Sequence, residues 1–387
     1  MLALMAGAFI PTPGASAATV SVAYHGGPVE HASNVYAIFW SPPGYAFPAG
    51  YAALVAQYFT DVAADSYAAS NVYSVPTQYY NGSGAKKNFA SYNVSYKGSI
   101  IDTKPFPAAA KQCPNYVLGD GSMSKVCLTG NQIENKVRGL VAAKRLPKGM
   151  STNYFLFTPQ GVASCKKGKS LAGGGCNNPL QFNGFCAFHA HIAAGAKAVI
   201  YENMPYAAIS GCGSGQSPNG NPADAVLNNV AHEHNESISD PLGTAWYDGN
   251  GQEIADKCHL MFGTPRGATA SGQYNQVING HGYWLQMLWS NRAGGCVQRN
   301  AFAQPVTTFT YKPSLPTHGK KVLFRSKVSE PGETKFSYRW TFPDGGTSTA
   351  KSPVHVFPAR LFAGPIILVV TDSHGSQTRT INFVTVV

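Results

Sequence analysis

Apolar residues recur every three or four positions in three segments of the chain, and this spacing predicts amphipathic helices. The predicted helices cover residues 49–65, residues 132–145 and a segment that starts at Pro222 and stops before Asp240. Asn221 is expected to cap the third helix, with Pro222 at its first position and an acid in its first turn. Both ends of this helix therefore carry clear sequence signals.

Apolar or alternating runs bounded by turn residues predict strands around these helices. They cover residues 19–24, 35–40, 71–80, 153–158, 185–192 and 198–206. From residue 307 the helix and cysteine signals stop, and short strands recur at residues 308–311, 321–326, 335–342, 353–357, 365–371 and 378–387. The pattern predicts an α+β region followed by a small all-β, immunoglobulin-like sandwich, with domains at residues 18–303 and 304–387.

Charged residues make up 12% of the chain, whereas about 25% is typical of soluble domains. The net charge of +11 comes from a shortage of acids and not from basic runs. A nucleic-acid site would gather Lys and Arg on one face between aromatic residues, so we expect no nucleic-acid partner. An acidic cell-surface polymer or an acidic medium suits such a low-carboxylate surface, and composition does not choose between them.

Eight widely spaced cysteines with no Cys-x-x-Cys pair predict four disulfides formed in an oxidising compartment. The expected pairs are Cys113–Cys127, Cys165–Cys176, Cys186–Cys212 and Cys258–Cys296. At the N-terminus a short apolar run leads to Ala15-Ser16-Ala17, which predicts a signal peptide over residues 1–17. No other segment reaches the roughly 18 apolar residues needed to cross a bilayer. We expect a secreted or cell-surface monomer without a membrane span.

The third predicted helix separates an apolar arc from a face rich in metal-binding groups. At about 100° per residue, the arc holds Leu227, Ala231, His234 and Ile238, and the opposite side holds Asn229, His232, Glu233 and Glu236. Residues four apart lie on one helix face, so His232 and Glu236 are expected to bind one Zn²⁺ ion. Glu233 would then act as the general base. A carboxylate ligand also suits harder divalent ions such as Mn²⁺ or Ca²⁺, and the alternative is a solvated polar face.

The third metal ligand must come from outside this helix. Glu253 and Asp256 lie shortly before Cys258, and we prefer Asp256, with Glu253 close behind. His189 shares a strand face with His191 because side chains alternate with a period of two, so both could reach a cleft or metal. The alternative for both histidines is a structural role.

Three further polar residues are assigned structural roles. We expect His234 to make hydrogen bonds in the core and Asp240 to stabilise the end of the helix. Asp248, in Asp-Gly-Asn-Gly, is expected to form a tight turn.

Several motifs together resemble a known family. They are Gly-Gly-Pro-Val at residues 26–29 with residues 34–36, Gly-Phe-Cys-Ala-Phe-His at residues 184–189, Val-Ala-His-Glu-His-Asn-Glu at residues 230–236, and residues 240–258. This set resembles the phosphate-induced, EXORDIUM-like secreted proteins of plants and their microbial relatives. The resemblance implies a secreted zincin-like domain with an edge strand near residues 198–206, but no settled activity, since the family is known for extracellular growth and nutrient signalling. The plant members usually have Leu-Ala at His234-Asn235, a departure that leaves the expected ligands in place.

The C-terminal part carries a second resemblance. Tyr-Arg-Trp-Thr-Phe-Pro-Asp-Gly-Gly at residues 338–346, followed by motifs at residues 352–357 and 370–375, is similar to a PKD domain. Pro343 stands where such domains usually have Gly. The resemblance implies an extracellular spacer or adhesion unit of a kind often fused to secreted hydrolases.

These observations predict a secreted zinc-dependent peptidase, or peptidase-like hydrolase, that acts on an extracellular protein or peptide. A cell-surface polymer would bind through the PKD-like domain. The alternative is a non-catalytic extracellular matrix or adhesion protein whose metal is structural or absent. Carbohydrate binding through exposed Tyr and Trp is a third hypothesis, which rests on composition alone.

Overall fold

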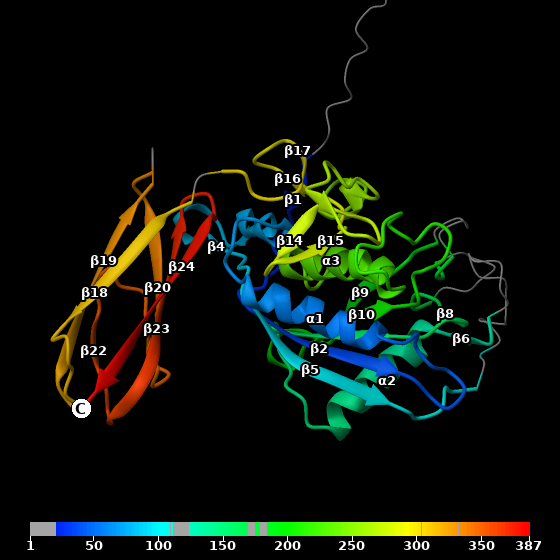
Figure 1. Cartoon of the computed structure of the whole chain (residues 1–387), viewed down its shortest axis with the longest axis horizontal. Helices are drawn as coiled ribbons and strands as arrows, with labels where there is room; N and C mark the ends of the chain where they lie inside the picture. Colours follow the sequence, from blue (N-terminus) through cyan, green and yellow to red (C-terminus); the bar gives the residue numbers. More distant parts are fainter. Residues whose placement is uncertain are drawn as a thin grey trace, which may run out of the picture.

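The structure is a computed structural model that describes residues 21–108, 110, 124–168, 175–178, 184–302, 304–330 and 333–387. It shows a larger domain built on a mixed sheet and a smaller C-terminal β-sandwich beside it (Figure 1). The predicted signal peptide lies outside the described residues. In the described part of the chain, no helix is both long and apolar enough to cross a membrane.

The larger domain is organised around a five-stranded sheet. Its strand order is β5 (Val94–Asp102), β2 (Ser33–Trp40), β7 (Thr152–Phe157), β10 (Val199–Met204) and β9 (Phe188–Ile192). The first four strands are parallel, and β9 pairs with β10 in the antiparallel direction. Every residue of β7 and β10 is buried, as expected for central parallel strands covered on both faces. The prediction of an edge strand near residues 198–206 is therefore wrong, because β10 is internal and β9 forms the edge.

Helices cover both faces of this sheet. α1 (Tyr51–Ala64) and α3 (Ala223–Ser239) lie on one face, and α2 (Gly130–Ala143) lies on the other (Figure 1). One core contains the inward residues of α1 and α3 packed on Val35, Phe39 and Phe155. The second contains α2 residues packed on Ile38 and Leu156. Alternate residues of β2 and β7 thus point into different cores. All three predicted helices are present, with small shifts at their ends.

Side-chain hydrogen bonds mark both ends of α3. The Asn221 Oδ1 atom accepts the Ala223 N–H at 3.0 Å just before the helix. At the other end, the Asp240 carboxylate accepts backbone N–H bonds from Thr244 and Ala245 at 2.6 and 2.8 Å. This confirms the structural role predicted for Asp240. The chain is thereby turned back along the helix towards the site.

Short elements surround this framework. Paired strands are β1 (Ala23–Tyr24) with β11 (Trp246–Tyr247), β3 (Tyr80–Asn81) with β4 (Asn88–Phe89), β6 (Val126–Leu128) with β8 (Val162–Ser164), β12 (Gly267–Ala268) with β13 (Gln273–Tyr274), β14 (Gln276–Ile278) with β15 (His281–Tyr283), and β16 (Leu288–Ser290) with β17 (Gly295–Val297). Short 3-10 helices are η1 (Val72–Ser74), η2 (Pro76–Gln78), η3 (Gly84–Lys86), η4 (Gly195–Lys197) and η5 (Asp256–Cys258).

The prediction of an extended segment over residues 71–80 is wrong, because the Asn71 side chain accepts the Tyr73 N–H and starts a helical turn.

Disulfides fix the loops around the site. Three predicted pairs are confirmed: Cys165–Cys176, Cys186–Cys212 and Cys258–Cys296. Cys113, of the fourth predicted pair, lies outside the described residues. The Cys258–Cys296 bridge joins η5 to β17, so it holds the segment that carries Asp256.

The C-terminal domain is the predicted antiparallel sandwich. One sheet has the order β18 (Val306–Lys312), β19 (Lys321–Ser329) and β22 (Val354–Val356). The other has the order β21 (Thr347–Ser348), β20 (Phe336–Thr341), β23 (Leu361–Asp372) and β24 (Gln377–Val386). Trp340, Phe324 and Leu368 are completely buried between the sheets and form the centre of the core.

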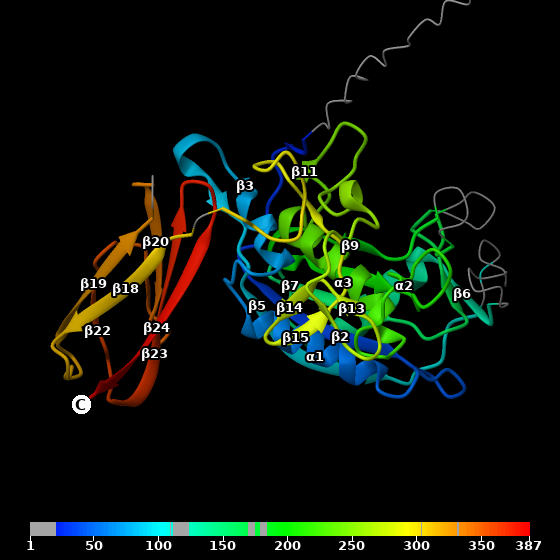
Figure 2. The ribbon, with the colours of Figure 1, turned by 45° about the horizontal axis from the view of Figure 1, so that its top comes forward.

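The two domains are joined by hydrogen bonds and by one close backbone contact. The loop with β3 and β4 lies beside the sandwich in both views (Figure 1; Figure 2). Ser91 donates to Gln377 at 2.9 Å, and Gln377 donates to the Ala90 carbonyl at 3.2 Å. Gly375 has a φ of +90°, and a Cβ atom there would overlap the Thr77 carbonyl oxygen. Only glycine therefore fits this contact without displacement.

Candidate metal centre

A polar cavity of about 390 Å³ lies between α3, β9 and the segment before Cys258. The predicted base and the five residues named as metal ligands all line it. These residues are His189, His232, Glu233, Glu236, Glu253 and Asp256. Side chains from three separate parts of the sequence therefore converge on one cavity.

His232, Glu236 and Asp256 form a compact set of donors. The His232 Nε2 atom lies 3.3 Å from Glu236 Oε2 and 3.4 Å from Asp256 Oδ1. Ligands at about 2.1 Å from a tetrahedral zinc ion are about 3.4 Å apart. The two distances from His232 Nε2 thus equal the ligand separation expected around zinc, all three donor atoms lie within 4.8 Å of one another, and imidazole and carboxylate are ligands that zinc accepts.

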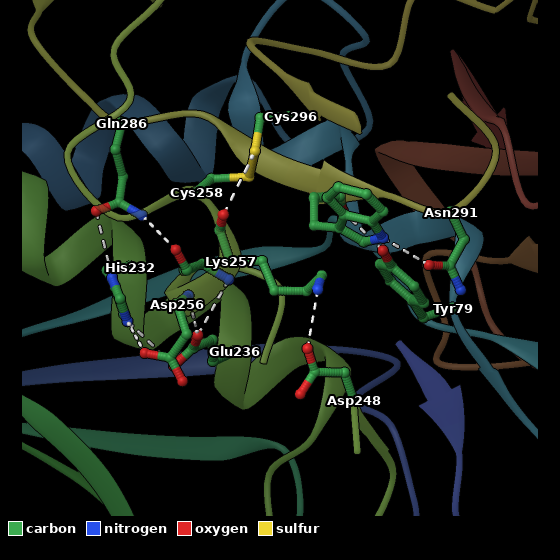
Figure 3. The surroundings of a disulfide bond; sticks show 12 residues. Tyr79, His232, Glu236, Asp248, Asp256, Lys257, Cys258, Gln286, Asn291 and Cys296 are labelled. Carbon is green, nitrogen blue, oxygen red and sulfur yellow. Dashed lines mark hydrogen bonds and ion pairs between the residues drawn. A yellow bond between two sulfur atoms is a disulfide. The ribbon is translucent and has the colours of Figure 1, made fainter. Parts of the chain in front are cut away.

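The second carboxylate oxygen of Glu236 orients this set. Glu236 Oε1 accepts the backbone N–H groups of Ala255 and Asp256, both at 3.0 Å (Figure 3). These bonds tie the start of η5 to α3 and leave Oε2 directed at His232. Asp256 is brought to the helix by this contact, although it is 20 residues further along the chain.

Gln286 orients the imidazole of His232 from the opposite side. The Gln286 amide nitrogen donates to the Ala255 carbonyl at 2.8 Å, so its oxygen faces His232 Nδ1 at 3.3 Å (Figure 3). Nδ1 therefore donates a hydrogen, and in the neutral ring Nε2 presents its lone pair to the carboxylates. Such an outer partner fixes the tautomer of a metal-binding histidine. No pattern in the sequence marks Gln286 for this role.

A second set of possible metal donors also includes Glu236. His189 Nδ1 lies 3.3 Å from Glu233 Oε2 and 3.8 Å from Glu236 Oε2. Its Nε2 atom lies 3.7 Å from Glu253 Oε2, and the buried Glu253 Oε1 has no hydrogen-bond partner among the described residues. His189 thus links Glu233 on the helix to Glu253 in the following loop. His191 is exposed and does not line the cavity.

Electrostatics favour positive charge in this cavity. Burial opposes protonation of His232, but the carboxylates of Glu236 and Glu233 outweigh it and raise its pKa well above the usual value. Burial likewise opposes protonation of His189, and Glu253 and Glu233 more than compensate, which raises its pKa. Burial would raise the pKa of Asp256, but His232 lowers it to about 2. Without a metal, these shifts favour the protonated form of both histidines, while burial raises the pKa of Glu236 and Glu253.

The predicted polar face of α3 is not a solvated surface. Glu233 and Glu236 are 6% and 3% exposed, so that alternative is wrong. His234 is buried and meets Ser33 Oγ at 2.8 Å and Tyr73 Oη at 3.1 Å, which confirms its predicted core role. Asp248 forms the predicted tight turn and also binds Lys257 at 2.9 Å, an ion pair that the sequence did not indicate (Figure 3).

Comparison with known proteins supports both resemblances in part. Residues 302–387 match the PKD domain family, so the sandwich is a PKD domain. Part of the chain is 36% identical to Protein EXORDIUM-like 3 of Arabidopsis thaliana, in a match that covers 22% of this chain and 30% of that protein. The match therefore spans less than a third of the relative's length. The disulfides and the PKD domain are consistent with an extracellular protein.

Two of the solved structures to which this chain is similar differ in their identity and coverage. The PKD1 domain of the Vibrio cholerae metalloprotease PrtV is 26% identical, with 21% of this chain and 96% of that chain covered and a TM-score of 0.19. OgpA from Akkermansia muciniphila is 10% identical, with 97% of both chains covered and a TM-score of 0.23.

Proposed function

We propose that this protein is a secreted zinc-dependent peptidase or peptidase-like hydrolase. His232, Glu236 and Asp256 would hold the metal, and Glu233 would be the general base. The observation that carries the proposal is the spacing of 3.3 and 3.4 Å from His232 Nε2 to the two carboxylate oxygens. Residues of α3 and η5 provide this spacing, and they are held together by two backbone N–H groups that donate to the Glu236 carboxylate.

The metal and Glu233 have separate roles in this mechanism. A zinc ion in such a site is a Lewis acid that lowers the pKa of water to about 7. Glu233 lines the same cavity next to the proposed ligands and would accept a proton from the attacking water at its carboxylate. His189, 3.3 Å from Glu233 Oε2, would orient this carboxylate and take up positive charge beside it.

The sheet edge supports a peptide substrate. β9 pairs only with β10 among the described strands, so no described strand is paired with its outer side. Phe188 and His189 of β9 also line the cavity. An extended peptide added along this edge would run past the proposed ligands, with its backbone held by main-chain hydrogen bonds.

A non-catalytic protein with a structural cation is the second hypothesis, and one observation favours it. Glu236 belongs to two donor groups, and one of them contains His189 and Glu233. If the ion is bound by that group, Glu233 is a ligand and cannot serve as the base. Glu253 would then complete the coordination shell, because its Oε1 atom has no hydrogen-bond partner within the described part of the chain.

Glu233→Gln separates the two hypotheses. In the peptidase, the variant retains its metal and loses casein hydrolysis by about a hundredfold or more. In the structural-site protein, the variant loses metal. Metal content would be measured by mass spectrometry after export and dialysis. Casein hydrolysis would be measured with and without a chelator. The matched control is Glu134→Gln on α2, which makes the same charge change on the opposite side of the sheet. Full hydrolysis by Glu233→Gln would exclude Glu233 as the base.

A further inference from the structure

A second cavity, of about 430 Å³, lies where the PKD domain meets the larger domain. None of its described lining residues belongs to the candidate metal centre. Tyr67 and Asn93 come from the larger domain, and Arg339 and Arg379 come from the PKD domain. The site therefore requires both domains, and we call it the interdomain groove.

The sheet register places the two arginines in one row. Arg339 of β20 is paired with Val369 of β23, and Val369 is paired with Arg379 of β24. Directly paired residues in adjacent strands point to the same face, and strands are about 4.8 Å apart. Both side chains thus leave the face that meets the larger domain, from backbone positions about 10 Å apart.

The groove carries positive charge without compensation. None of the described residues that line it is acidic. In the described part of the chain, neither arginine lies within 4.0 Å of a carboxylate. Arg339 donates instead to Tyr67 Oη at 3.1 Å and Ser91 Oγ at 3.4 Å, and the Arg379 guanidinium lies 5.5 Å from the centre of the Tyr67 ring. A guanidinium has donors to spare beyond these contacts.

The groove is extended at both ends. An adjoining cavity of about 310 Å³ shares Arg339 and Val369 with it and adds Lys87. In the other direction, the next rows of the sheet pair Ile367 with Ile381 and Pro365 with Phe383. Ile381 and Phe383 are 40% and 68% exposed. A basic strip therefore continues into an exposed apolar strip that ends in an aromatic ring.

We propose that the interdomain groove binds an anionic polysaccharide. Its carboxylate or sulfate groups would pair with Arg339 and Arg379, because a guanidinium can donate two parallel N–H bonds to two oxygens of one anionic group. Sugar rings would pack on Tyr67 and, beyond the basic row, on Phe383. The neutral side chains of Asn93, Ser151 and Thr341 offer hydrogen bonds suited to sugar hydroxyls. This binding does not depend on the metal centre.

The test measures binding of the full chain to defined probes by calorimetry at low and physiological salt. The anionic probes are a galacturonate oligosaccharide and a heparin oligosaccharide, which distinguish carboxylate from sulfate. A neutral glucan oligosaccharide and poly-glutamate are the comparisons. The variant is Arg379→Gln, because Arg379 makes no hydrogen bond across the domain contact among those described. The matched control is Arg325→Gln on β19, an exposed arginine in the other sheet of the sandwich.

We expect at least one anionic oligosaccharide to bind and the neutral glucan not to bind. Arg379→Gln should weaken this binding about tenfold, as the loss of a hydrogen bond to a charged group does. Arg325→Gln should change it less than about twofold. Equal losses in the two variants would show that only net charge is sensed and would overturn the proposal. Poly-glutamate binding as tight as the sugar would replace the polysaccharide with an acidic peptide. A second variant, Arg379→Lys, keeps the charge and should lose part of the affinity, which a folding defect would not reproduce.

Discussion

Glu236 has two functions in the structure, and two substitutions can separate them. One oxygen, Oε1, accepts two backbone N–H bonds at 3.0 Å, and the other, Oε2, faces His232 at 3.3 Å. Glu236→Gln keeps an oxygen for the N–H groups and replaces the proposed metal ligand with a donor. Glu236→Ala removes both functions. The two variants should therefore be equally poor at binding metal and unequal in stability.

The magnitudes follow from these contacts. Two hydrogen bonds to a charged acceptor contribute about 1.5–3 kcal/mol each, so Glu236→Ala should lose about 3–6 kcal/mol of unfolding free energy. Glu236→Gln keeps both bonds as neutral ones, at about 0.5–1.5 kcal/mol each, and should be more stable than Glu236→Ala by about 1–3 kcal/mol. Loss of a direct ligand should weaken zinc binding by more than about a hundredfold, the upper range for outer partners.

The assay is urea unfolding of the chelated proteins, together with zinc competition titrations of the folded ones. Chelated wild-type protein is the reference, and Glu134→Gln is the charge control. If Glu236→Gln binds zinc as wild type does, Glu236 is not a ligand. If Glu236→Ala is as stable as Glu236→Gln without metal, the hydrogen bonds to Ala255 and Asp256 do not hold η5 against the helix.

Three further predictions concern other contacts. Gln286→Leu removes the acceptor for His232 Nδ1, and zinc affinity should fall about 10- to 100-fold in a competition titration; unchanged affinity would mean that Gln286 does not orient the ring. Gly375→Ala should loosen the domain contact at Thr77, so limited proteolysis between the two domains should become faster. The control is Gly345→Ala, at a glycine with open space around it, which should leave the rate of proteolysis unchanged. Burial raises the pKa of Glu202 to about 8 from the ordinary glutamate value of 4.5. The folded state therefore holds a proton that the unfolded chain releases at lower pH. The free energy of unfolding falls as the pH rises between these two values. Glu202→Gln should therefore stabilise the protein by a few kcal/mol at pH 8 and by little at pH 4 in thermal unfolding; equal effects at both pH values would contradict the burial argument.

Part of this protein follows from local sequence patterns. The period of apolar residues located α1, α2 and α3, and alternation with turn residues located the strands of the sandwich. The predicted roles of His234 and Asp240 also follow from position alone, because helix geometry fixes which side and which end each residue occupies. These predictions succeed because each depends on residues within a few turns of one another.

Other features depend on contacts between distant segments. Residues 71–80 have an extended pattern, yet a side-chain cap at Asn71 starts a helical turn there. The sequence favoured Asp256 and offered His189 only as a further candidate, and neither distance to the helix could be obtained from spacing. These distances depend on β9 being the sheet edge and on η5 being tied to α3.

The candidate metal ligands, and the helix that carries two of them, can be identified from residue types and spacing alone. Which of these residues meet depends on the packing of the whole chain, which also brings Gln286 to His232 and places Arg339 and Arg379 beside Tyr67 in the interdomain groove. The reason is physical: helix and strand periodicity is a property of neighbouring residues, whereas a cavity is defined by strand order and by packing between segments far apart in the chain.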